Sequence, residues 1–266
     1  MKPANTIRLD EQQLTSEITK IFRHGPIKLL YLDSCESTNI ECLKLSADYA
    51  VVIAEHQTAG RGRRGNNWHS PLSQNIYCSI GLNKPIKAEY LGLISLLVGL
   101  CIVKVLRAMG VDEVNLKWPN DILLQGKKLG GILIETRATS PDNFYLVIGF
   151  GLNINLANDD LKSIGQPAIS LNQHLENSLD RQQLITSLIG QILYEVNKFE
   201  LNRIDGLIAE YNQYDIFIGR HVLVKTASEE LSGIHRGIQR TGQIQVETSR
   251  GLELFSAAEI SLREIK

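Results

Sequence analysis

The sequence has little excess charge, no apolar signal core and no apolar run long enough to cross a membrane. Its formal net charge is only −1 over 266 residues, whereas a dedicated nucleic-acid binder usually carries a broad basic excess. The N-terminus has no apolar signal core. The longest apolar-or-small run, Tyr90 to Val103, is shorter than the ~18 residues that cross a bilayer. These shortages weigh against a nucleic-acid-binding module and against a membrane protein, and we expect a cytoplasmic protein.

Cysteine and histidine are also sparse. None of the four cysteines, Cys35, Cys42, Cys78 and Cys101, stands in a C-x-x-C pair. This predicts reduced, mostly buried thiols. The six histidines are scattered without metal-ligand spacing. We therefore predict no structural zinc site and no metal held by protein ligands.

Apolar periodicity predicts an α/β fold with a mixed sheet and flanking helices. Helices are expected over residues 8–24, from Thr38 for about a dozen residues, and over 88–109, 180–199 and 204–211. Strands are expected at 27–32, 50–54, 75–81, 114–118, 122–124, 129–136 and 144–154, and a loop is expected at 155–175. Short strands at 217–226, 232–238, 242–248, 251–255 and 259–264 predict a small C-terminal β-barrel. The expected division is an N-terminal extension with a short helix (1–26), an α/β domain (27–214) and the barrel (215–266).

A loop rich in glycine and arginine, within residues 54–68, follows the strand at 50–54. Three glycines alternate with three arginines in Gly60-Arg61-Gly62-Arg63-Arg64-Gly65. A guanidinium group can bond two oxygens of a carboxylate or phosphate at once, and in α/β sheets ligands bind at the carboxyl ends of strands. The loop is therefore a candidate anion site, expected to be mobile when empty. A solvated basic loop and an RGG-like nucleic-acid segment are the alternatives.

Three further clusters of polar residues and glycines accompany this loop. Ser37-Thr38-Asn39 begins a helix, where Thr38 and Glu41 form a capping-box pattern, although the same hydroxyl and amide groups suit a polar ligand. A proline turn, Lys117-Trp118-Pro119-Asn120-Asp121, ends a strand. Lys128 stands at the return of the next predicted hairpin, before Gly130-Gly131, which indicates a close backbone approach. Taken alone, Lys128 and Asp121 also fit an exposed turn lysine and a turn aspartate.

In this order, these motifs resemble the biotin–protein ligase family. The resemblance also includes Gly151-Leu152-Asn153 and the ending Glu259-Ile260-Ser261-Leu262-Arg263, and it covers about residues 28–266. It implies that residues 27–214 are a catalytic domain that binds biotin and ATP, with a small β-barrel after it. It further implies two half-reactions, in which biotin and ATP form biotinyl-5′-AMP and a lysine of a carrier protein then takes the biotin.

The resemblance implies roles for residues of these motifs. Lys128, Asp121 and Arg63 would be catalytic, with Asp121 positioning or deprotonating the acceptor lysine. The biotin site would comprise Ser37, Thr38, Asn39, Gln57, Gly60, Arg61, Arg63, Lys128, Gly130 and Gly131. The ATP and adenylate site would comprise Arg63, Arg64, Trp68, Lys117, Asn120, Lys128, Asn153 and Arg263. Trp68 is expected to cover the adenylate, with core packing as the alternative.

The resemblance also implies substrates and partners. ATP would enter with Mg²⁺ bound mainly through its phosphates, and the acceptor would be the biotin carboxyl carrier protein of acetyl-CoA carboxylase. A homodimer is compatible with the family. Members that also repress transcription carry an N-terminal winged helix-turn-helix, whereas here the first predicted strand begins at residue 27, so we expect ligase activity without specific DNA binding.

One residue of the Gly-Arg loop departs from the family pattern, and one alternative function remains. Asn66 stands where many members have a further basic residue, which lowers the positive charge of the loop. A lipoate–protein ligase of a related fold is the alternative function. The Gly-Arg loop and the C-terminal barrel favour biotin.

Overall fold

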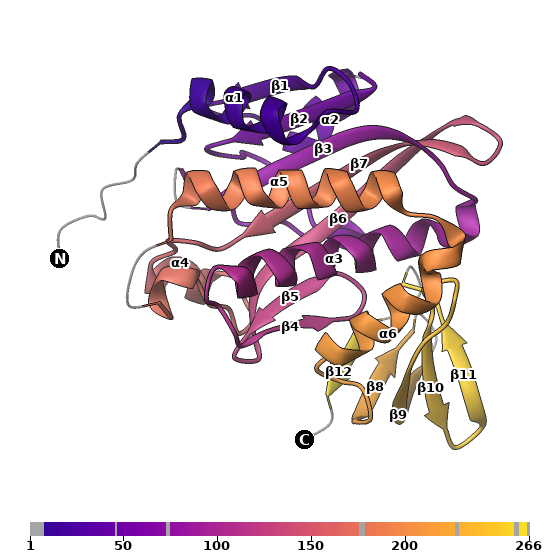
Figure 1. Ribbon diagram of the computed structural model, residues 1–266. Helices are drawn as coiled ribbons and strands as arrows, with labels where there is room; N and C mark the ends of the chain where they lie inside the picture. The colour runs from indigo at the N-terminus through magenta and orange to yellow at the C-terminus, as the bar shows by residue number, and fades with distance from the viewer. Residues whose placement is uncertain are drawn as a thin grey trace.

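The computed structural model describes residues 8–45, 47–72, 75–175, 179–226, 229–257 and 261–264. A seven-stranded mixed sheet forms its centre, in the order β1-β2-β3-β7-β6-β5-β4 (Figure 1). Only β1 and β2 are parallel, and all other neighbours are antiparallel. The strands are β1 (Lys28–Leu32), β2 (Tyr49–Ala54), β3 (Ile76–Pro85), β4 (Val114–Lys117), β5 (Asp121–Leu124), β6 (Lys127–Ser140) and β7 (Asn143–Leu152).

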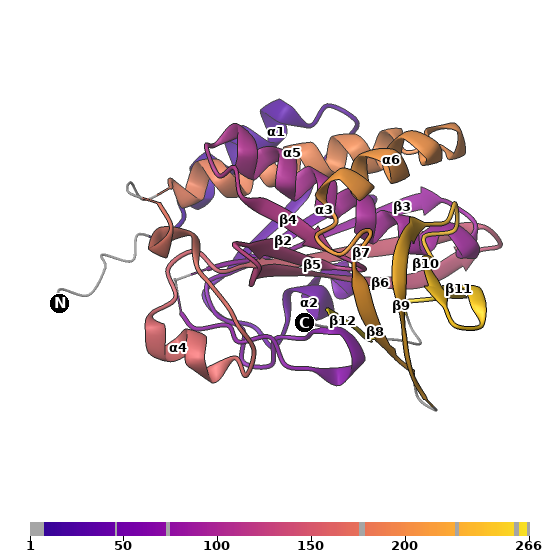
Figure 2. The same cartoon turned by 90° about the horizontal axis from the view of Figure 1, so that it is seen from below.

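Helices cover both faces of this sheet. Figure 2 shows α1 (Glu11–Ile21), α3 (Leu91–Ala108), α5 (Arg181–Lys198) and α6 (Ile204–Tyr214) on one side, and α2 (Thr38–Leu45) and α4 (Asn158–Ser163) on the other. Because both faces are covered, β2 and β7 are buried along most of their length, which explains why they read as continuous apolar runs. Asp180 caps α5 by accepting from the backbone N–H groups of Gln182 and Gln183, at the predicted boundary.

The stretch Ala88–Ala108 is long and apolar enough to cross a membrane by composition alone. It consists of a 3₁₀ turn, η2 (Ala88–Tyr90), and α3. In the fold α3 packs against the sheet beside α5, with most of its apolar side chains buried. The helix is therefore the central core helix that the sequence predicts, and Gly110, at φ +86°, ends it.

The C-terminal strands form a second, antiparallel sheet in the order β11-β10-β9-β8-β12. They are β8 (His221–Lys225), β9 (Glu230–Ile238), β10 (Ile244–Thr248), β11 (Gly251–Phe255) and β12 (Ser261–Glu264). The small all-β unit expected here is present. Its described pairings make an open sheet with β11 and β12 at the edges, and among the described residues no pairing closes it into a barrel.

Two local predictions are wrong. Residues 155–175 contain α4 and a 3₁₀ turn, η3 (Leu171–Gln173), in place of a plain loop. Thr38 does not serve as a capping residue, because it is the first residue of α2 and its hydroxyl contacts Gln57, which follows β2, and Ser79 of β3. Two further 3₁₀ turns are η1 (Arg63–Gly65) and η4 (Leu201–Arg203).

The cysteines are free thiols, as predicted. Cys42, Cys78 and Cys101 are buried, and Cys35 is half-buried. Burial raises the pKa of the Cys35 thiol to about 11 and that of the Cys42 thiol to about 12. All four are therefore protonated and weakly nucleophilic at neutral pH.

Candidate active site

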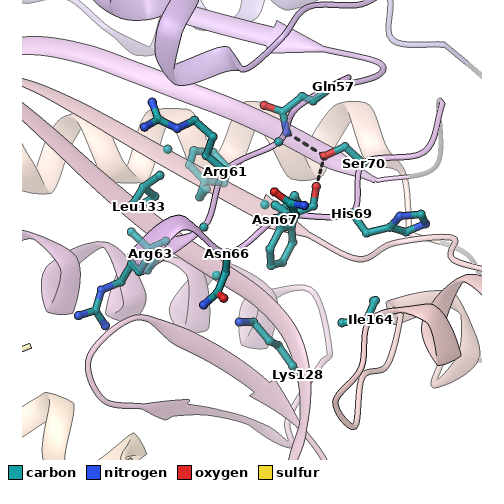
Figure 3. Close-up of a pocket in the computed structure, with 18 of the residues that line it drawn as sticks. Gln57, Arg61, Arg63, Asn66, Asn67, His69, Ser70, Lys128, Leu133 and Ile164 are labelled. Carbon is teal, nitrogen blue, oxygen red and sulfur yellow. Dashed lines mark hydrogen bonds between the residues drawn. The ribbon is translucent and has the colours of Figure 1, made fainter. Parts of the chain in front are cut away.

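A cavity of about 1060 Å³ opens on the face of the sheet that carries α2 (Figure 3). The Gly-Arg loop, the start of α2, the proline turn, the β5–β6 hairpin and the segment after α4 all contribute to its lining. It brings together almost every residue predicted from the sequence: Ser37, Thr38, Asn39, Gln57, Gly60, Arg61, Arg63, Arg64, Trp68, Lys117, Asn120, Asp121, Lys128, Gly131 and Asn153.

One side of the cavity is a neutral hydrogen-bonding floor. The backbone N–H of Thr38 donates to Gln57 Oε1 over 2.9 Å, and Gln57 Nε2 donates to Ser70 Oγ over 2.9 Å. Ser70 Oγ in turn donates to the carbonyl of Trp68. A backbone N–H can only donate and a carbonyl can only accept, so both ends fix the orientation of the Gln57 amide. The floor therefore offers polar groups of defined polarity to a neutral ligand.

The other sides of the cavity carry cations. Lys128 Nζ lies 2.7 Å from Asp121 Oδ1, and both side chains are more than four-fifths buried. Arg61 pairs with Glu135 over 3.2 Å. In Figure 3 the side chains of Arg61, Arg63 and Lys128 extend in different directions. Among the described lining residues Asp121 is the one carboxylate, so the lining is positively charged as a whole and suits an anionic ligand.

Arg63 retains its charge without a described carboxylate partner. One of its NH groups donates to Asn120 Oδ1 over 3.1 Å and another to the carbonyl of Ala257, both neutral acceptors. Burial lowers the pKa of Arg63, and the neighbouring charge of Arg64 lowers it further, while Asp121 raises it. A guanidinium remains charged despite such a shift. Arg63 can therefore neutralise an anion in the cavity.

The Gly-Arg loop has a defined hairpin-like conformation. Arg61 and Asn67 form an isolated antiparallel bridge, and the N–H of Trp68 donates to the carbonyl of Gly60 over 2.8 Å. A Cβ at Gly60 would lie 2.5 Å from the Trp68 carbonyl oxygen, so no other residue fits there without a shift. Arg64 adopts φ +57°, a left-handed conformation that is uncommon for a side-chain-bearing residue. Ordering of the loop by an anion stays a prediction.

Trp68 lies on the floor between the loop and the sheet. A Cβ at Gly151 would lie 2.6 Å from the indole, and one at Gly131 would lie 3.3 Å from it. The indole therefore occupies space that glycines leave open on β6 and β7. Its buried Nε1 has no hydrogen-bond partner, and Lys128 Nζ lies 5.6 Å from the ring centroid.

Backbone contacts fix the position of Lys128. Its N–H donates to the carbonyl of Pro167, and its carbonyl accepts from the N–H of Ile169. Asn153 is buried, and its Nδ2 donates to the carbonyl of Ile169 over 3.2 Å. The segment after α4 thus holds the β5–β6 hairpin through backbone hydrogen bonds, and it also forms one wall of the cavity. Asn153 supports this arrangement, while its predicted contact with an adenylate stays a prediction.

Two predicted residues stand apart from the others. Gly130 does not line the cavity, because a Cβ there would meet the side chain of Leu152 at 2.4 Å. Neighbouring residues of a strand face opposite sides, so Gly131 faces the cavity and Gly130 faces the core. Arg263 lies in β12, opposite Leu223 of β8, and its side chain lies outside the described part of the structure.

Several lining residues were not predicted from the sequence. They include Ser70, His69 and the segment 163–168. His69 Nε2 lies 3.3 Å from Asp160 Oδ1, so the loop and α4 meet at this point. These unpredicted lining residues belong to no sequence motif, and only the fold brings them to the cavity. Among the described residues, no group of three or more His, Cys, Asp or Glu side chains could hold a metal ion.

Two family models match separate parts of the chain. Residues 33–153 match the model of the Biotin/lipoate A/B protein ligase family, and residues 217–263 match the Biotin protein ligase C terminal domain. The Bifunctional ligase/repressor BirA of Escherichia coli is 37% identical over 214 residues, covering 80% of this chain and 66% of that protein. The chain thus spans just under two thirds of that relative's length.

Two further similarities cover nearly complete proteins. The Biotin--[acetyl-CoA-carboxylase] ligase of Mycobacterium tuberculosis is 32% identical over 236 residues, covering 84% of this chain and 85% of that protein. The solved structure of biotin protein ligase from Aquifex aeolicus in complex with biotin and ATP superposes with a TM-score of 0.76 at 26% identity. It covers 90% of this chain and 99% of that one.

Proposed function

Because this chain belongs to the biotin/lipoate A/B protein ligase family, we propose that it is a biotin–protein ligase. It would activate biotin with ATP and transfer it to a lysine of a biotin carboxyl carrier protein. One observation carries the proposal: a single cavity joins a neutral hydrogen-bonding floor to a set of cations, of which Lys128 is more than four-fifths buried. The cyclic urea of biotin suits the floor, and its carboxylate and the phosphates of ATP suit the cations.

In the first half-reaction, an oxygen of the biotin carboxylate attacks the α-phosphorus of ATP. The bond from that phosphorus to the oxygen bridging to the β-phosphate breaks, and pyrophosphate leaves. Two anions must meet, so cationic groups have to offset their repulsion and the charge that develops on the phosphate. We assign this task to Lys128, Arg61 and Arg63. Mg²⁺ would enter with ATP and neutralise the remaining phosphate charge.

In the second half-reaction, the acceptor lysine attacks the acyl carbon of biotinyl-5′-AMP. The bond from this carbon to the phosphate oxygen breaks, AMP leaves and an amide forms. A lysine amine has a pKa near 10.4, so only a fraction on the order of 10⁻³ to 10⁻⁴ is neutral at pH 7. Asp121, beside Lys128 at the cationic end of the cavity, is our candidate for positioning this amine or taking its proton.

The walls of the cavity would protect the adenylate from water. The Gly-Arg loop and residues of the segment 163–168 both line the cavity, and a closed site excludes water from a reactive acyl-adenylate. We propose that Trp68 covers the adenylate, and that Arg64, Lys117, Asn120 and Asn153 contact it.

The acceptor and the cellular setting are proposals as well. The names of the relatives from Mycobacterium tuberculosis and Paracoccus denitrificans specify acetyl-CoA carboxylase. We therefore propose the biotin carboxyl carrier protein of acetyl-CoA carboxylase as the acceptor, in the cytoplasm. A homodimer and the absence of specific DNA binding stay predictions.

Transfer to a carrier domain tests the proposal. The purified chain, biotin and Mg·ATP are incubated with a biotin carboxyl carrier domain, and the intact mass of the carrier is measured. We expect its mass to rise by one biotin less one water, and no rise when arginine replaces the acceptor lysine. Modification by lipoate in place of biotin would favour the related lipoate ligases. No modification by either acid would contradict the proposal.

A further inference from the structure

Glu135 is a carboxylate beside the cavity that the proposed reaction does not use. It lies on β6, on the same face as Gly131 and Leu133, which line the cavity. One of its oxygens pairs with Arg61, and the other accepts from Asn39 Nδ2 over 2.8 Å. Asn39 is buried at the start of α2. Glu135 therefore contacts both the cationic loop and the neutral floor.

The contact with Glu135 fixes which way the Asn39 amide faces. An ionised carboxylate can only accept hydrogen bonds, so the NH₂ group of Asn39 must point toward it. The backbone carbonyl of Leu133, 3.4 Å from Asn39 Nδ2, is a second acceptor on the same side. The amide oxygen must then point the other way, toward Ser79 on β3, whose Oγ lies 2.6 Å from it.

The orientation of the Asn39 amide determines which hydroxyl donates in the contact between Ser79 and Thr38. Ser79 is fully buried and has one hydroxyl proton. Because the Asn39 oxygen cannot donate, Ser79 must give that proton to Asn39. Ser79 Oγ also lies 2.7 Å from Thr38 Oγ1, so this second contact is a hydrogen bond only if Thr38 is the donor. Gln57 Oε1, 3.2 Å from Thr38 Oγ1, is the other acceptor within reach of that proton, but the contact with Ser79 is shorter. With its single proton directed at Ser79, Thr38 offers only lone pairs to the cavity.

We propose that Glu135 is a positioning residue that sets the hydrogen-bond polarity of the floor. Acting through Asn39 and Ser79, it makes Thr38 an acceptor for an N–H group of a cyclic urea. The inference rests on the proposed function, because biotin is the ligand that brings such a group. An amide at position 135 could donate as well as accept. Asn39 could then reverse, Ser79 could donate to Thr38, and the Thr38 proton would leave Ser79 and turn to the side of Gln57 Oε1 and the ligand.

The test measures KM for biotin, KM for ATP and kcat in biotin-dependent ATP–pyrophosphate exchange. We expect Glu135→Gln to raise the biotin KM about tenfold, the size of one hydrogen bond. The ATP KM and kcat should change by less than about twofold, because the change weakens binding of one substrate only. Glu247→Gln removes a surface partner of Arg236 in the C-terminal sheet and serves as the matched control, with all three constants unchanged.

Two combinations separate the pathway through the floor from the pair with Arg61. In Thr38→Val the acceptor is gone, so adding Glu135→Gln should raise the biotin KM no further. In Ser79→Ala the link is cut by a small change that leaves the Arg61–Glu135 pair intact, and Glu135→Gln should again have no added effect. The inference would be overturned if Glu135→Gln raised the biotin KM by the same factor in both backgrounds as in the unmodified chain. It would also be overturned if Glu135→Gln raised the KM for ATP and not the KM for biotin. Thermal unfolding of each variant checks its fold.

The two proposals fail in different ways. If the unmodified chain shows no biotin-dependent exchange, the proposed function is wrong. If it is active and Glu135→Gln leaves the biotin KM unchanged, the function stands and the role of Glu135 is wrong.

Discussion

Lys128 is the side chain on which the proposed chemistry depends most. It lies at the cationic end of the cavity, held by backbone contacts on both sides and paired with Asp121 over 2.7 Å. Removing one such preorganised charge costs about 10²- to 10³-fold in rate at comparable sites. We therefore expect Lys128→Gln to slow adenylate formation by about that factor, measured as single-turnover release of pyrophosphate. Its neighbour Lys127 is exposed, and Lys127→Gln should leave the rate unchanged. Equal rates for the two variants would contradict the assignment.

Asp121 is expected to act mainly in the second half-reaction. Asp121→Ala removes the proposed partner of the acceptor amine, so transfer from preformed biotinyl-5′-AMP should slow by about 10²-fold. The ion pair with Lys128 means that adenylate formation should also change, but by less than about tenfold. Separate single-turnover measurements of the two steps give the comparison. Equal losses would instead assign Asp121 a structural role or a role with the metal.

At the scale of single residues, the sequence predicts which residues belong to the site better than it predicts which way each of them faces. The ordered motifs bring almost every predicted side chain to one cavity. They cannot distinguish Gly130 from Gly131, because that depends on strand register, and β5 and β6 shift register between Ile122 and Leu123. Glu135 belongs to no predicted site, because its contacts with Asn39 and Arg61 span more than seventy residues each.

Among the elements, the root of the Gly-Arg loop is held by an unusual buried pair. Glu55 ends the buried run of β2 and is 1% exposed, and it pairs with Arg181 at the first turn of α5. It also accepts from the Tyr31 hydroxyl over 2.5 Å and from the backbone N–H of Leu9 over 3.3 Å. Burial alone would raise the pKa of Glu55, but the Tyr31 hydrogen bond and the charge of Arg181 outweigh it, and the pKa is lowered.

Breaking this pair should destabilise the fold. Arg181→Met leaves an uncompensated buried carboxylate, which costs about 3–5 kcal/mol. Arg236→Met, which removes half of a surface pair with Glu247, should cost less than about 1 kcal/mol. Urea denaturation at pH 7 measures both free energies of unfolding. A loss for Arg181→Met no larger than for the surface control would show that the buried pair does not hold the loop root.

The lowered pKa also predicts the effect of acid. A carboxyl whose pKa is lower in the folded state stabilises the fold above its unfolded pKa, about 4.3 for glutamate. This stabilisation is lost as the pH falls through the lower, folded value. In Arg181→Met the folded pKa of Glu55 should rise, so the stability profile should lose its acid-side slope near pH 4.

Element boundaries were predictable wherever the periodicity was strong. Helices α3 and α5 and the β5–β6 hairpin occur where predicted, because apolar spacing and the turn at Gln125-Gly126 determine them locally. Helix α4 was missed, because it is six residues long and mostly polar, with Leu161 as its one buried residue. The strand order of the main sheet is set by packing between distant segments, and no local pattern encodes it.

For the whole molecule, the contact between the two sheets lies next to the cavity. Trp118 of the proline turn is buried, and its Nε1 donates over 3.0 Å to the carbonyl of Gly242 in the turn between β9 and β10 of the C-terminal sheet. His235 Nε2 lies 2.9 Å from Asp215 Oδ2, and both side chains are fully buried. The N–H of Gly237 donates to His235 Nδ1, so the ring proton is on Nε2 and points to Asp215. The C-terminal sheet thus supports the turn that carries Asp121.

Replacing each of the two tryptophans by phenylalanine tests this contact. Trp118→Phe leaves the Gly242 carbonyl without its donor, at a cost of about 1–3 kcal/mol. Trp68→Phe removes an indole N–H that has no partner, so no hydrogen bond is lost and the cost should be smaller. Chemical denaturation of both variants gives the comparison. Equal costs would mean that the hydrogen bond between the sheets contributes nothing measurable.

Biotin-dependent exchange of labelled pyrophosphate into ATP tests the central claim most directly. It requires only the chain, biotin and Mg·ATP, and it detects reversible attack of a carboxylate on the α-phosphate without any acceptor protein. We predict exchange with biotin, none with lipoate, and loss of exchange in Lys128→Gln. Exchange with lipoate alone would preserve the chemistry but contradict the substrate. The absence of exchange with either acid would contradict the claim that this cavity activates a carboxylate.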